Sequence, residues 1–212
     1  MYKRQGEVSP EGADVVLLTQ RPGLPPRSTA VEAVAMVTRD KVRAQELLAA
    51  AGLHELADVP VPALSGGQAA HVALVRALAA RPAVLILDEP LAAVDVKSAE
   101  RWRGFLRAAR EDRTTLLVTH SALDIANLAR DMLVMDSGRV RAHDTTARLL
   151  NAPPSGFVAA LAGLNRLEGT VTEIGASAVE VACGDITVLA ATEHASLAPG
   201  QKVAVTLSLI HI

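Results

Sequence analysis

The sequence predicts an α/β core followed by a small all-β domain. Short apolar runs alternate with segments of helical periodicity over roughly residues 14–150, which is typical of a sheet with helices packed on it. One run, residues 83–87, is apolar without alternation, as expected for a central strand of a parallel sheet covered on both faces. Beyond Leu164 the pattern changes to four short strands separated by turn residues, which indicates an incomplete β-barrel.

Composition narrows the class of protein. The 212 residues can bury a substantial core, and that core must be aliphatic because only 2% of the residues are aromatic. A net charge of −2 gives no electrostatic reason to expect nucleic acid as a partner. The single cysteine, Cys183, excludes an intrachain disulfide and fits a reducing compartment. No apolar run approaches the roughly 18 to 20 residues of a membrane span.

Breaker and cap residues set the boundaries of the predicted elements. The first strand ends at Gln20, and a proline-rich loop follows it. Ser28 or Thr29 is expected to cap the first helix, and Gly52 to stop the second. The predicted strands span residues 15–19, 83–87, 114–119, 132–135, 140–143, 167–174, 178–182, 186–191 and 202–207, and the predicted helices span residues 29–36, 40–51, 97–110, 122–130 and 157–162, besides one that ends before Arg81-Pro82.

Residues 64–68, Leu-Ser-Gly-Gly-Gln, have the outline of an anion site. Ser65 stands just before a helical segment, so its hydroxyl can cap the helix or donate to a ligand. Gly66 and Gly67 let the backbone approach a phosphate closely, and the N–H groups and dipole of a first helical turn favour negative charge. A Ser-Gly-Gly triplet alone is more often a flexible turn, so the functional interpretation depends on the motifs that follow it.

A second candidate site follows the strand at 83–87. Asp88 and Glu89 are adjacent carboxylates at the carboxyl end of a predicted parallel strand, where open α/β sheets bind their ligands. Asp88 is predicted to hold Mg²⁺, directly or through water, because Mg²⁺ prefers oxygen ligands. Glu89 is predicted to orient and deprotonate an attacking water, a division of labour that fits nucleotide hydrolysis.

These two stretches resemble a known family, the ATP-binding subunits of ATP-binding-cassette (ABC) transporters. Residues 64–68 match that family's signature motif, and residues 84–89 are similar to its Walker B strand with the following catalytic glutamate. The resemblance implies a partial P-loop NTPase core with a helical subdomain and two cofactors, ATP and Mg²⁺.

Three further residues match the family in the same chain order. Asp95 occupies the aspartate position of the D-loop, which residues 91–95 resemble. His120 follows a predicted strand as the family's switch histidine does, and Gln20 follows the first strand as its Q-loop glutamine does. Together the motifs span roughly residues 14–150.

The resemblance implies a role for each matched residue. Glu89 would activate the attacking water, and His120 would contact the γ-phosphate of ATP. Asp88 and Gln20 would hold Mg²⁺. The residues implied to bind ATP, some of them ATP held by a second subunit, are Gln20, Ser65, Gly66, Gly67, Gln68 and Asp95.

The resemblance also implies partners and a place in the cell. The complete protein would form a head-to-tail homodimer with a second ATPase subunit and would bind transmembrane permease subunits through its helical subdomain. It would be cytoplasmic and peripheral on the inner face of the cell membrane, with no nucleic acid among its partners. In this family, dimer closure around ATP supplies the mechanical step of transport.

The Walker A loop of this family, Gly-x-x-x-x-Gly-Lys-Ser/Thr, is missing from the sequence. Lys97-Ser98 is the one Lys that Ser or Thr follows, and no glycine precedes it at the required spacing. The resemblance places that loop upstream of Gln20, so the chain is expected to lack the N-terminal part of the protein and to be inactive alone. Residues 1–5 and 209–212 look like cloning sequence, so both true ends are expected to be missing.

The residues just after the signature motif depart from the family's pattern. The family commonly has Arg or Gln followed by another Arg, whereas this chain has Ala69, Ala70 and His71. We interpret these changes as tuning, because they touch no catalytic group directly. His71 and the histidines other than His120 have no metal-ligand spacing and are interpreted as ordinary.

The last 49 residues, 164–212, resemble the C-terminal regulatory barrel of molybdate-type importer ATPases, although less specifically. Breaker residues at 151–156 mark a boundary, which gives a partial ATP-binding domain at 1–150, a linker with a short helix at 151–163, and a partial regulatory barrel at 164–212. Oxyanion binding to the barrel would have to use backbone N–H groups near Gly175 and Gly184 with hydroxyls such as those of Ser177 and Thr187, and a purely structural appendage is the alternative, slightly favoured over it.

The implied function is ATP binding and hydrolysis in an importer for molybdate or a related oxyanion. Two alternatives remain open. A soluble ABC protein outside transport would typically carry a second cassette or a long coiled-coil insertion, and this sequence contains neither. A non-catalytic regulatory or oxyanion-binding module would explain the missing Walker A loop as natural loss, and the upstream reading frame decides between that and truncation.

Overall fold

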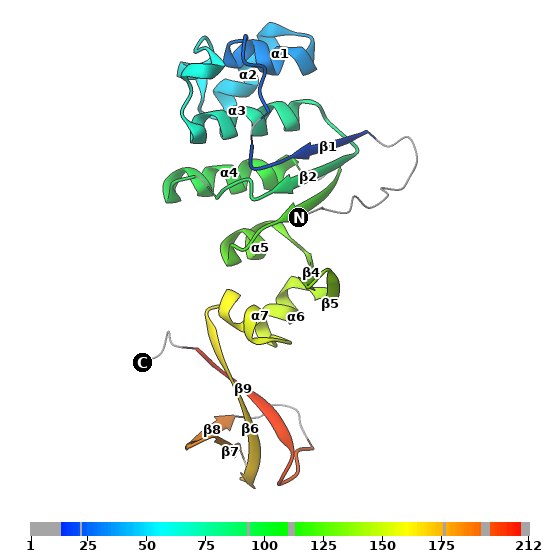
Figure 1. Ribbon diagram of the computed structural model, residues 1–212, viewed down its shortest axis with the longest axis vertical. Coiled ribbons are helices and arrows are strands. Elements are labelled where there is room, and N and C mark those ends of the chain that lie inside the picture. Colours follow the sequence, from blue (N-terminus) through cyan, green and yellow to red (C-terminus); the bar gives the residue numbers. More distant parts are fainter. Residues whose placement is uncertain are drawn as a thin grey trace. The chain divides into compact units, whose positions relative to one another are not determined.

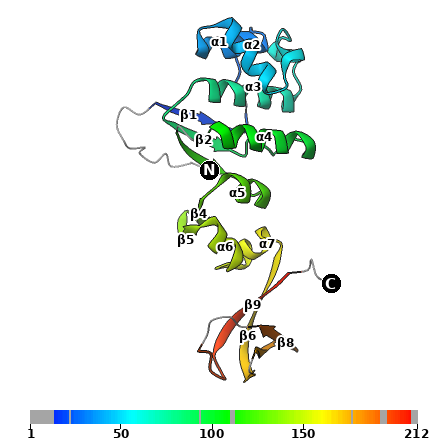
Figure 2. The ribbon, with the colours of Figure 1, turned by 180° about the vertical axis from the view of Figure 1, so that it is seen from behind.

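The computed structural model describes residues 14–21, 23–92, 94–109, 113–175, 177–191 and 196–208. These residues form two compact units, one that ends at His120 and one that begins at Ser121 (Figures 1 and 2). The predicted cloning segments at both ends, and Ala93 of the 91–95 stretch, lie outside the described residues. The domain boundaries predicted from the breaker residues, after residues 150 and 163, stay predictions.

The first unit is built on a three-stranded parallel sheet. Its strands, in spatial order, are β1 (Val15–Leu18), β2 (Val84–Asp88) and β3 (Thr114–Val118). Leu87 in β2 lies opposite both Leu18 and Leu117, which confirms that this strand is central and that the sheet is parallel. The carboxyl ends of all three strands therefore lie at the same edge.

The two faces of this sheet differ in exposure. Leu85 and Leu87 on one face are each 1% exposed. On the other face Leu17 and Leu116, which lie on either side of Ile86, are 58% and 47% exposed. The sequence predicts that both faces of the central strand are buried. Among the described residues, only the face that carries Leu85 and Leu87 is buried.

The helices of the first unit begin after capping residues, of which the sequence analysis predicts Thr29 and Ser65. The helices are α1 (Ala30–Thr38), α2 (Lys41–Ala50), α3 (Gly66–Ala79) and α4 (Val96–Ala109), with short 3₁₀ turns η1 (His54–Leu56) and η2 (Val61–Ala63) before α3. Thr29 caps α1 in a reciprocal pair with Glu32, whose carboxylate accepts the Thr29 N–H at 2.8 Å. Asp40 caps α2 by accepting the N–H groups of Val42 and Arg43.

The core of the helical part is aliphatic, as the composition predicts. Helices α1 and α2 pack against each other and against α3, which Figures 1 and 2 show from opposite sides. The fully buried side chains there include Val31, Val34, Leu48, Val72, Leu74 and Val75. This packing holds α3, and therefore the residues at its start, on a rigid support.

The second unit begins with short elements around a small aliphatic core. These are α5 (Ala122–Leu128), the hairpin of β4 (Asp131–Asp136) and β5 (Arg139–Thr145), α6 (Thr146–Asn151) and α7 (Gly156–Leu161). Ile125, Met132 and Val158 are buried together at their centre. Helix α6 has no counterpart in the sequence-based prediction.

The second unit continues as an open antiparallel sheet. Its strands are β6 (Leu164–Ile174), β7 (Ala178–Cys183), β8 (Ile186–Ala191) and β9 (Lys202–Ser208), in the order β8-β7-β6-β9. All four predicted strands are confirmed, and β8 and β9 are its edges, so no closed barrel forms among the described residues. No described helix in either unit is long and apolar enough to cross a bilayer.

Candidate functional site

The carboxyl edge of the three-stranded sheet gathers most of the polar residues that the sequence singles out. Asp88 ends β2 and Glu89 follows it, while Thr119 and His120 follow β3 directly. Gln20 comes two residues after the end of β1. Because parallel strands end at one edge, the backbone brings these residues to the same side of the sheet.

The Glu89 carboxylate joins the ends of β2 and β3. Its Oε1 accepts the backbone N–H of His120 at 3.1 Å and lies 2.6 Å from His120 Nδ1. Its Oε2 accepts the Thr119 hydroxyl at 3.3 Å. The two residues predicted to be catalytic, 31 positions apart in the chain, therefore lie in direct contact.

The surroundings of this pair are asymmetric. The Glu89 side chain is 14% exposed, whereas the His120 side chain is 79% exposed. Since a carboxylate only accepts hydrogen bonds, Nδ1 of His120 carries the shared proton and Nε2 remains for a ligand in solution. Of the roughly four lone-pair sites on a carboxylate, three are used here, so one lone pair on Oε2 remains for another donor.

The backbone at Glu89 is held in an unusual conformation. Its φ is 50°, in the left-handed region that residues with a Cβ rarely adopt. The Glu89 N–H donates to the Val118 carbonyl at 2.9 Å, which extends the pairing of β2 with β3 by one residue. Local strain of this kind costs on the order of 1 to 3 kcal/mol and persists where the surrounding structure fixes it. Here the sheet and the Glu89 hydrogen bonds supply that restraint.

Asp88 and Gln20 offer oxygen atoms at the same edge. The Asp88 side chain is half-buried and Gln20 is exposed, and among the described residues neither side chain has a hydrogen-bond or ion-pair partner. A carboxylate and an amide carbonyl are the donors that suit Mg²⁺, which keeps several waters and takes few protein ligands. The residues therefore fit such an ion, although the described part of the chain holds no cluster of three or more His, Cys, Asp or Glu around a metal position.

The signature stretch begins helix α3 with a reciprocal cap. Gln68 N–H donates to Ser65 Oγ at 3.2 Å, and Ser65 N–H donates to Gln68 Oε1 at 2.9 Å. The predicted capping role of Ser65 is therefore confirmed. Ser65 and Gly66 are exposed, and a side-chain atom added at Gly66 would meet nothing within 4 Å. The start of α3 is thus open to a ligand.

Asp95 lies at the start of α4. Its Oδ1 accepts the Ser98 N–H at 3.0 Å, and its carbonyl accepts the Ala99 N–H at 2.8 Å, so it caps the helix. Within this chain, Glu89 and His120 are in direct contact, whereas Asp95 and the Ser65–Gln68 turn each cap the start of a helix.

Two contacts near the site have no counterpart in the sequence-based prediction of site residues. The Thr119 hydroxyl donates to Glu89. The sequence signal that could have indicated this contact is the position of Thr119 at the end of a predicted strand, next to His120. Arg76 of α3 donates to the Gly23 carbonyl at 3.3 Å, which connects the signature helix to the loop that follows Gln20. That contact spans 53 residues, so no local pattern could indicate it.

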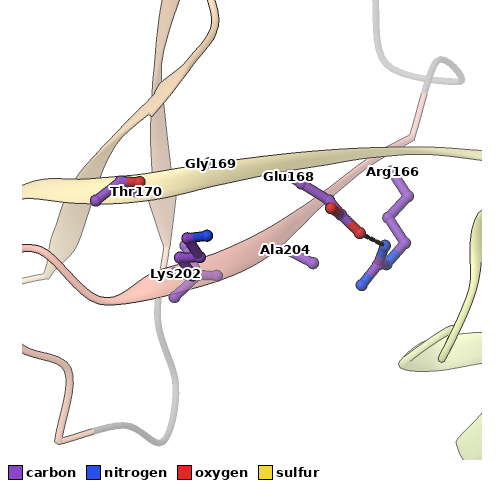
Figure 3. Close-up of a pocket in the computed structure, with 7 residues that line it drawn as sticks. Arg166, Glu168, Gly169, Thr170, Lys202 and Ala204 are labelled. Carbon is purple, nitrogen blue, oxygen red and sulfur yellow. Dashed lines mark hydrogen bonds and ion pairs between the residues drawn. The ribbon is translucent and has the colours of Figure 1, made fainter.

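A second candidate site lies in the open sheet of the second unit. A pocket of about 440 Å³ is lined by β6 and β9, with Arg166, Glu168, Thr170 and Lys202 around it (Figure 3). Arg166 Nη1 donates to Glu168 Oε1 at 2.6 Å, so one of the two cations there already has an internal partner. The pocket is polar, open and carries at most one unbalanced positive charge.

This pocket is not where the sequence predicts an oxyanion. The Gly175 N–H donates to the Ala178 carbonyl at 2.8 Å and closes the turn between β6 and β7. The prediction that N–H groups near Gly175 are available to an anion is therefore wrong at that residue, because the turn itself uses the donor. The cationic side chains lie instead on the β6–β9 pair.

Comparisons with known proteins agree with the geometry of the first unit. The family described as ABC transporter matches residues 3–92. The molybdenum import ATP-binding protein ModC of Mycobacterium tuberculosis is 42% identical over 135 residues, which cover 63% of this chain and 37% of that protein. The sulfate/thiosulfate import ATP-binding protein CysA of Xanthomonas campestris pv. campestris is 40% identical over 136 residues, which cover 63% of this chain and 40% of that protein. The chain therefore spans about two fifths of the length of these relatives.

Solved structures give the same assignment of fold. The dimeric, post-hydrolysis state of the ATP-binding cassette MJ0796, bound to ADP and Pi, is similar with a TM-score of 0.57 and 27% identity, and the match covers 63% of each chain. An inward-facing metal-chelate type ABC transporter has a TM-score of 0.57 at 22% identity, covering 76% of this chain and 69% of that one. The second likeness concerns the fold alone.

Proposed function

The chain contains part of an ABC transporter ATP-binding domain, and from that premise we propose that the complete protein binds and hydrolyses ATP to energise an importer of molybdate or a related oxyanion. The observation that carries the proposal is the contact of Glu89 with His120 at the carboxyl edge of the sheet. The relatives named for molybdenum and sulfate import support the class of substrate.

Glu89 acts as the general base in ATP hydrolysis. Its one unused lone pair on Oε2 accepts a proton from a water placed beyond the edge of the sheet. The hydrogen bonds from Thr119 and His120 fix the carboxylate, so it needs no reorientation when the water arrives. The left-handed backbone at Glu89 serves the same end, because it turns the side chain toward β3.

His120 contacts the terminal phosphate. With Nδ1 bound to Glu89, an imidazolium at His120 presents Nε2–H as a donor to a phosphate oxygen. Its side chain is 79% exposed, which leaves that nitrogen accessible to a nucleotide. Asp88 and Gln20 would hold Mg²⁺, and the ion would neutralise phosphate charge.

The Ser65–Gln68 turn and Asp95 serve the partner subunit. Both lie at the exposed starts of helices, as expected for groups that meet a nucleotide held elsewhere. The first helical turn of α3 then offers backbone N–H groups and a favourable dipole to the phosphates of a second cassette. The likeness to a dimeric cassette bound to ADP and Pi supports a head-to-tail homodimer, with permease subunits as further partners on the inner face of the membrane.

The test uses the complete protein, including the Walker A loop that this sequence lacks. Asp88→Asn is expected to abolish Mg²⁺-dependent ATP hydrolysis, because the amide loses the charge that holds the ion. Asp185→Asn, in the turn between β7 and β8, is the matched control and is expected to keep the parental rate. Hydrolysis by Asp88→Asn at the parental rate contradicts the proposal, and uptake of molybdate against sulfate by cells that carry the complete system decides the substrate.

A non-catalytic oxyanion module remains the second candidate, because of the Arg166–Lys202 pocket. Molybdate, tungstate and sulfate, with phosphate as control, are titrated against the complete protein and against its Lys202→Gln variant. Saturable binding that Lys202→Gln weakens, in a protein that lacks ATP hydrolysis, favours this candidate. The absence of saturable binding removes it and leaves the ATPase proposal unchanged.

A further inference from the structure

A stack of two rings joins helices α3 and α4. His71 lies on α3, six residues after the Ser65 cap, and Trp102 lies on α4, seven residues after Asp95. The ring centroids are 4.8 Å apart and the ring planes are inclined by 26°. Trp102 is 1% exposed and also meets the edge of Phe105. The stack is therefore a packed contact inside the first unit.

The electrostatic surroundings of His71 favour its neutral form. Burial lowers the pKa of the imidazole first, the nearby Arg101 guanidinium lowers that pKa further, and Asp95 opposes them. Nε2 of His71 is buried and has no hydrogen-bond partner among the described residues. A proton added there would be left without an acceptor, so the ring serves as a flat, uncharged surface at neutral pH.

Arg101 extends this contact to a third helix. Its guanidinium lies against Gly52, the residue with φ of 73° just after α2, so closely that a Cβ at Gly52 would collide with Nη1. Helix α4 thus contacts the end of α2 through Arg101 and the second turn of α3 through Trp102. A charged residue, or one without a ring, at position 71 would not pack in the same way.

The stack lies close to two helix starts that matter for the proposed chemistry. A helix rises about 1.5 Å per residue, so a contact six or seven residues along lies roughly 10 Å from the cap residue and directly follows the first turn. Because a helix is stiff over that length, fixing one ring against the other fixes the two first turns relative to each other. Those turns carry the Ser65–Gln68 clamp and the Asp95 cap.

We propose that the stack of His71 on Trp102 is a positioning contact that holds the first turn of α3 in register with the first turn of α4. The proposal rests on the proposed function for the role of those turns in nucleotide binding. Neither ring touches the nucleotide. In phosphoryl transfer the protein contributes mainly placement, so a loosened register lowers turnover.

Hydrogen exchange in the 212-residue chain tests the register without any nucleotide. Since an aromatic pair contributes modestly, His71→Ala is expected to raise amide exchange in the first turns of α3 and α4 by roughly two- to tenfold. Exchange in α1 stays at the parental rate, and His71→Phe, which keeps a ring, restores both turns. Unchanged exchange in the two turns, or an equal rise in α1, overturns the proposal.

Fluorescence provides a second readout that does not depend on a folded alanine variant. Trp102 is the one tryptophan in the sequence, and a protonated imidazole stacked on an indole quenches its emission. Emission of the parent chain is expected to fall as pH is lowered below about 6.5, the ordinary pKa of histidine. His71→Phe removes that step, and His54→Gln, at an exposed position, keeps it. A step of the same size in His71→Phe contradicts the stack.

ATPase kinetics of the complete protein distinguish a failure of this inference from a failure of the proposed function. His71→Ala is expected to lower kcat with little change in KM, and His71→Phe is expected to restore kcat. An unchanged kcat in His71→Ala overturns the positioning role. A parental protein without ATPase activity overturns the proposed function, while the exchange and fluorescence results still decide whether the stack holds the two helices.

Discussion

Glu89→Gln in the complete protein is the sharpest test of the hydrolytic pair. The substitution keeps the shape of the side chain and removes its ability to take a proton. The amide oxygen of glutamine can still accept from the His120 backbone N–H and imidazole, and its NH₂ can donate to the Thr119 hydroxyl, which rotates to accept. The site therefore stays packed.

The structure sets the size of the two expected effects. A hydrogen bond to a charged group contributes about 1.5 to 3 kcal/mol and a neutral one about 0.5 to 1.5 kcal/mol. His120 is 79% exposed, so solvent screens the pair and the loss of folding stability is at the low end, about 1 kcal/mol. Loss of a general base lowers turnover by on the order of 10² to 10⁴. A loss of stability of that size is too small to explain such a fall in rate.

The assay measures kcat for ATP hydrolysis, ATP affinity and chemical unfolding on the same preparations. Glu173→Gln, at an exposed position on β6, is the matched control for loss of a carboxylate. ATP affinity is expected to stay at the parental level in Glu89→Gln while kcat falls. Hydrolysis at the parental rate would show that Glu89 is not the base, and a parallel loss of ATP affinity would show that its role is structural.

Three further predictions concern this chain itself. The chain is expected to bind Mg-ATP poorly and not to hydrolyse it, because its sequence has no Walker A phosphate cradle; isothermal titration that gives low-micromolar affinity for the isolated chain would contradict this. Gly169→Ala is expected to lower the free energy of unfolding by about 1 to 3 kcal/mol, because its Cβ would lie 2.6 Å from the Ala182 carbonyl oxygen. The control Gly104→Ala, in α4 with no atom within 4 Å of the new Cβ, is expected to raise that free energy slightly, and denaturant titration compares the two. Since the folded-state pKa of His71 is lowered, the unfolded chain binds more protons just below the ordinary histidine pKa, so stability is complete above about pH 6.5 and falls as pH drops below it. Denaturation at a series of pH values checks this, and a His71→Gln variant with the same pH dependence as the parent would refute the assignment to His71.

Local chemistry made the helix starts predictable from sequence. The caps at Thr29, Asp40 and Ser65 each bind an N–H two or three residues further along, so the residues that make the bond are neighbours in the chain. The uniform apolar character of residues 84–87 likewise indicated a central parallel strand, because only burial selects such a run. Because parallel strands end at the same edge of a sheet, Asp88 and Glu89 lie at the edge where open α/β sheets bind their ligands.

Sequence also determined the order of the motifs, but not which of them meet. Glu89 and His120 are in contact because β2 and β3 pair with Asp88 opposite Val118, a register that no local pattern specifies. Ser65 and Asp95, which belong to the same set of motifs, cap helices α3 and α4 instead.

Contacts between distant residues were decided by tertiary packing alone. His71 has no distinguishing pattern in the sequence, and its partner Trp102 lies on another helix. The position of the cationic pocket depends on the β6–β9 pairing, while the turn at Gly175 uses the donor that sequence reasoning left free. Caps and strands follow from bonds between neighbours, whereas a stack, a pocket or a hydrolytic pair exists only after the chain has folded and fixed which surfaces touch.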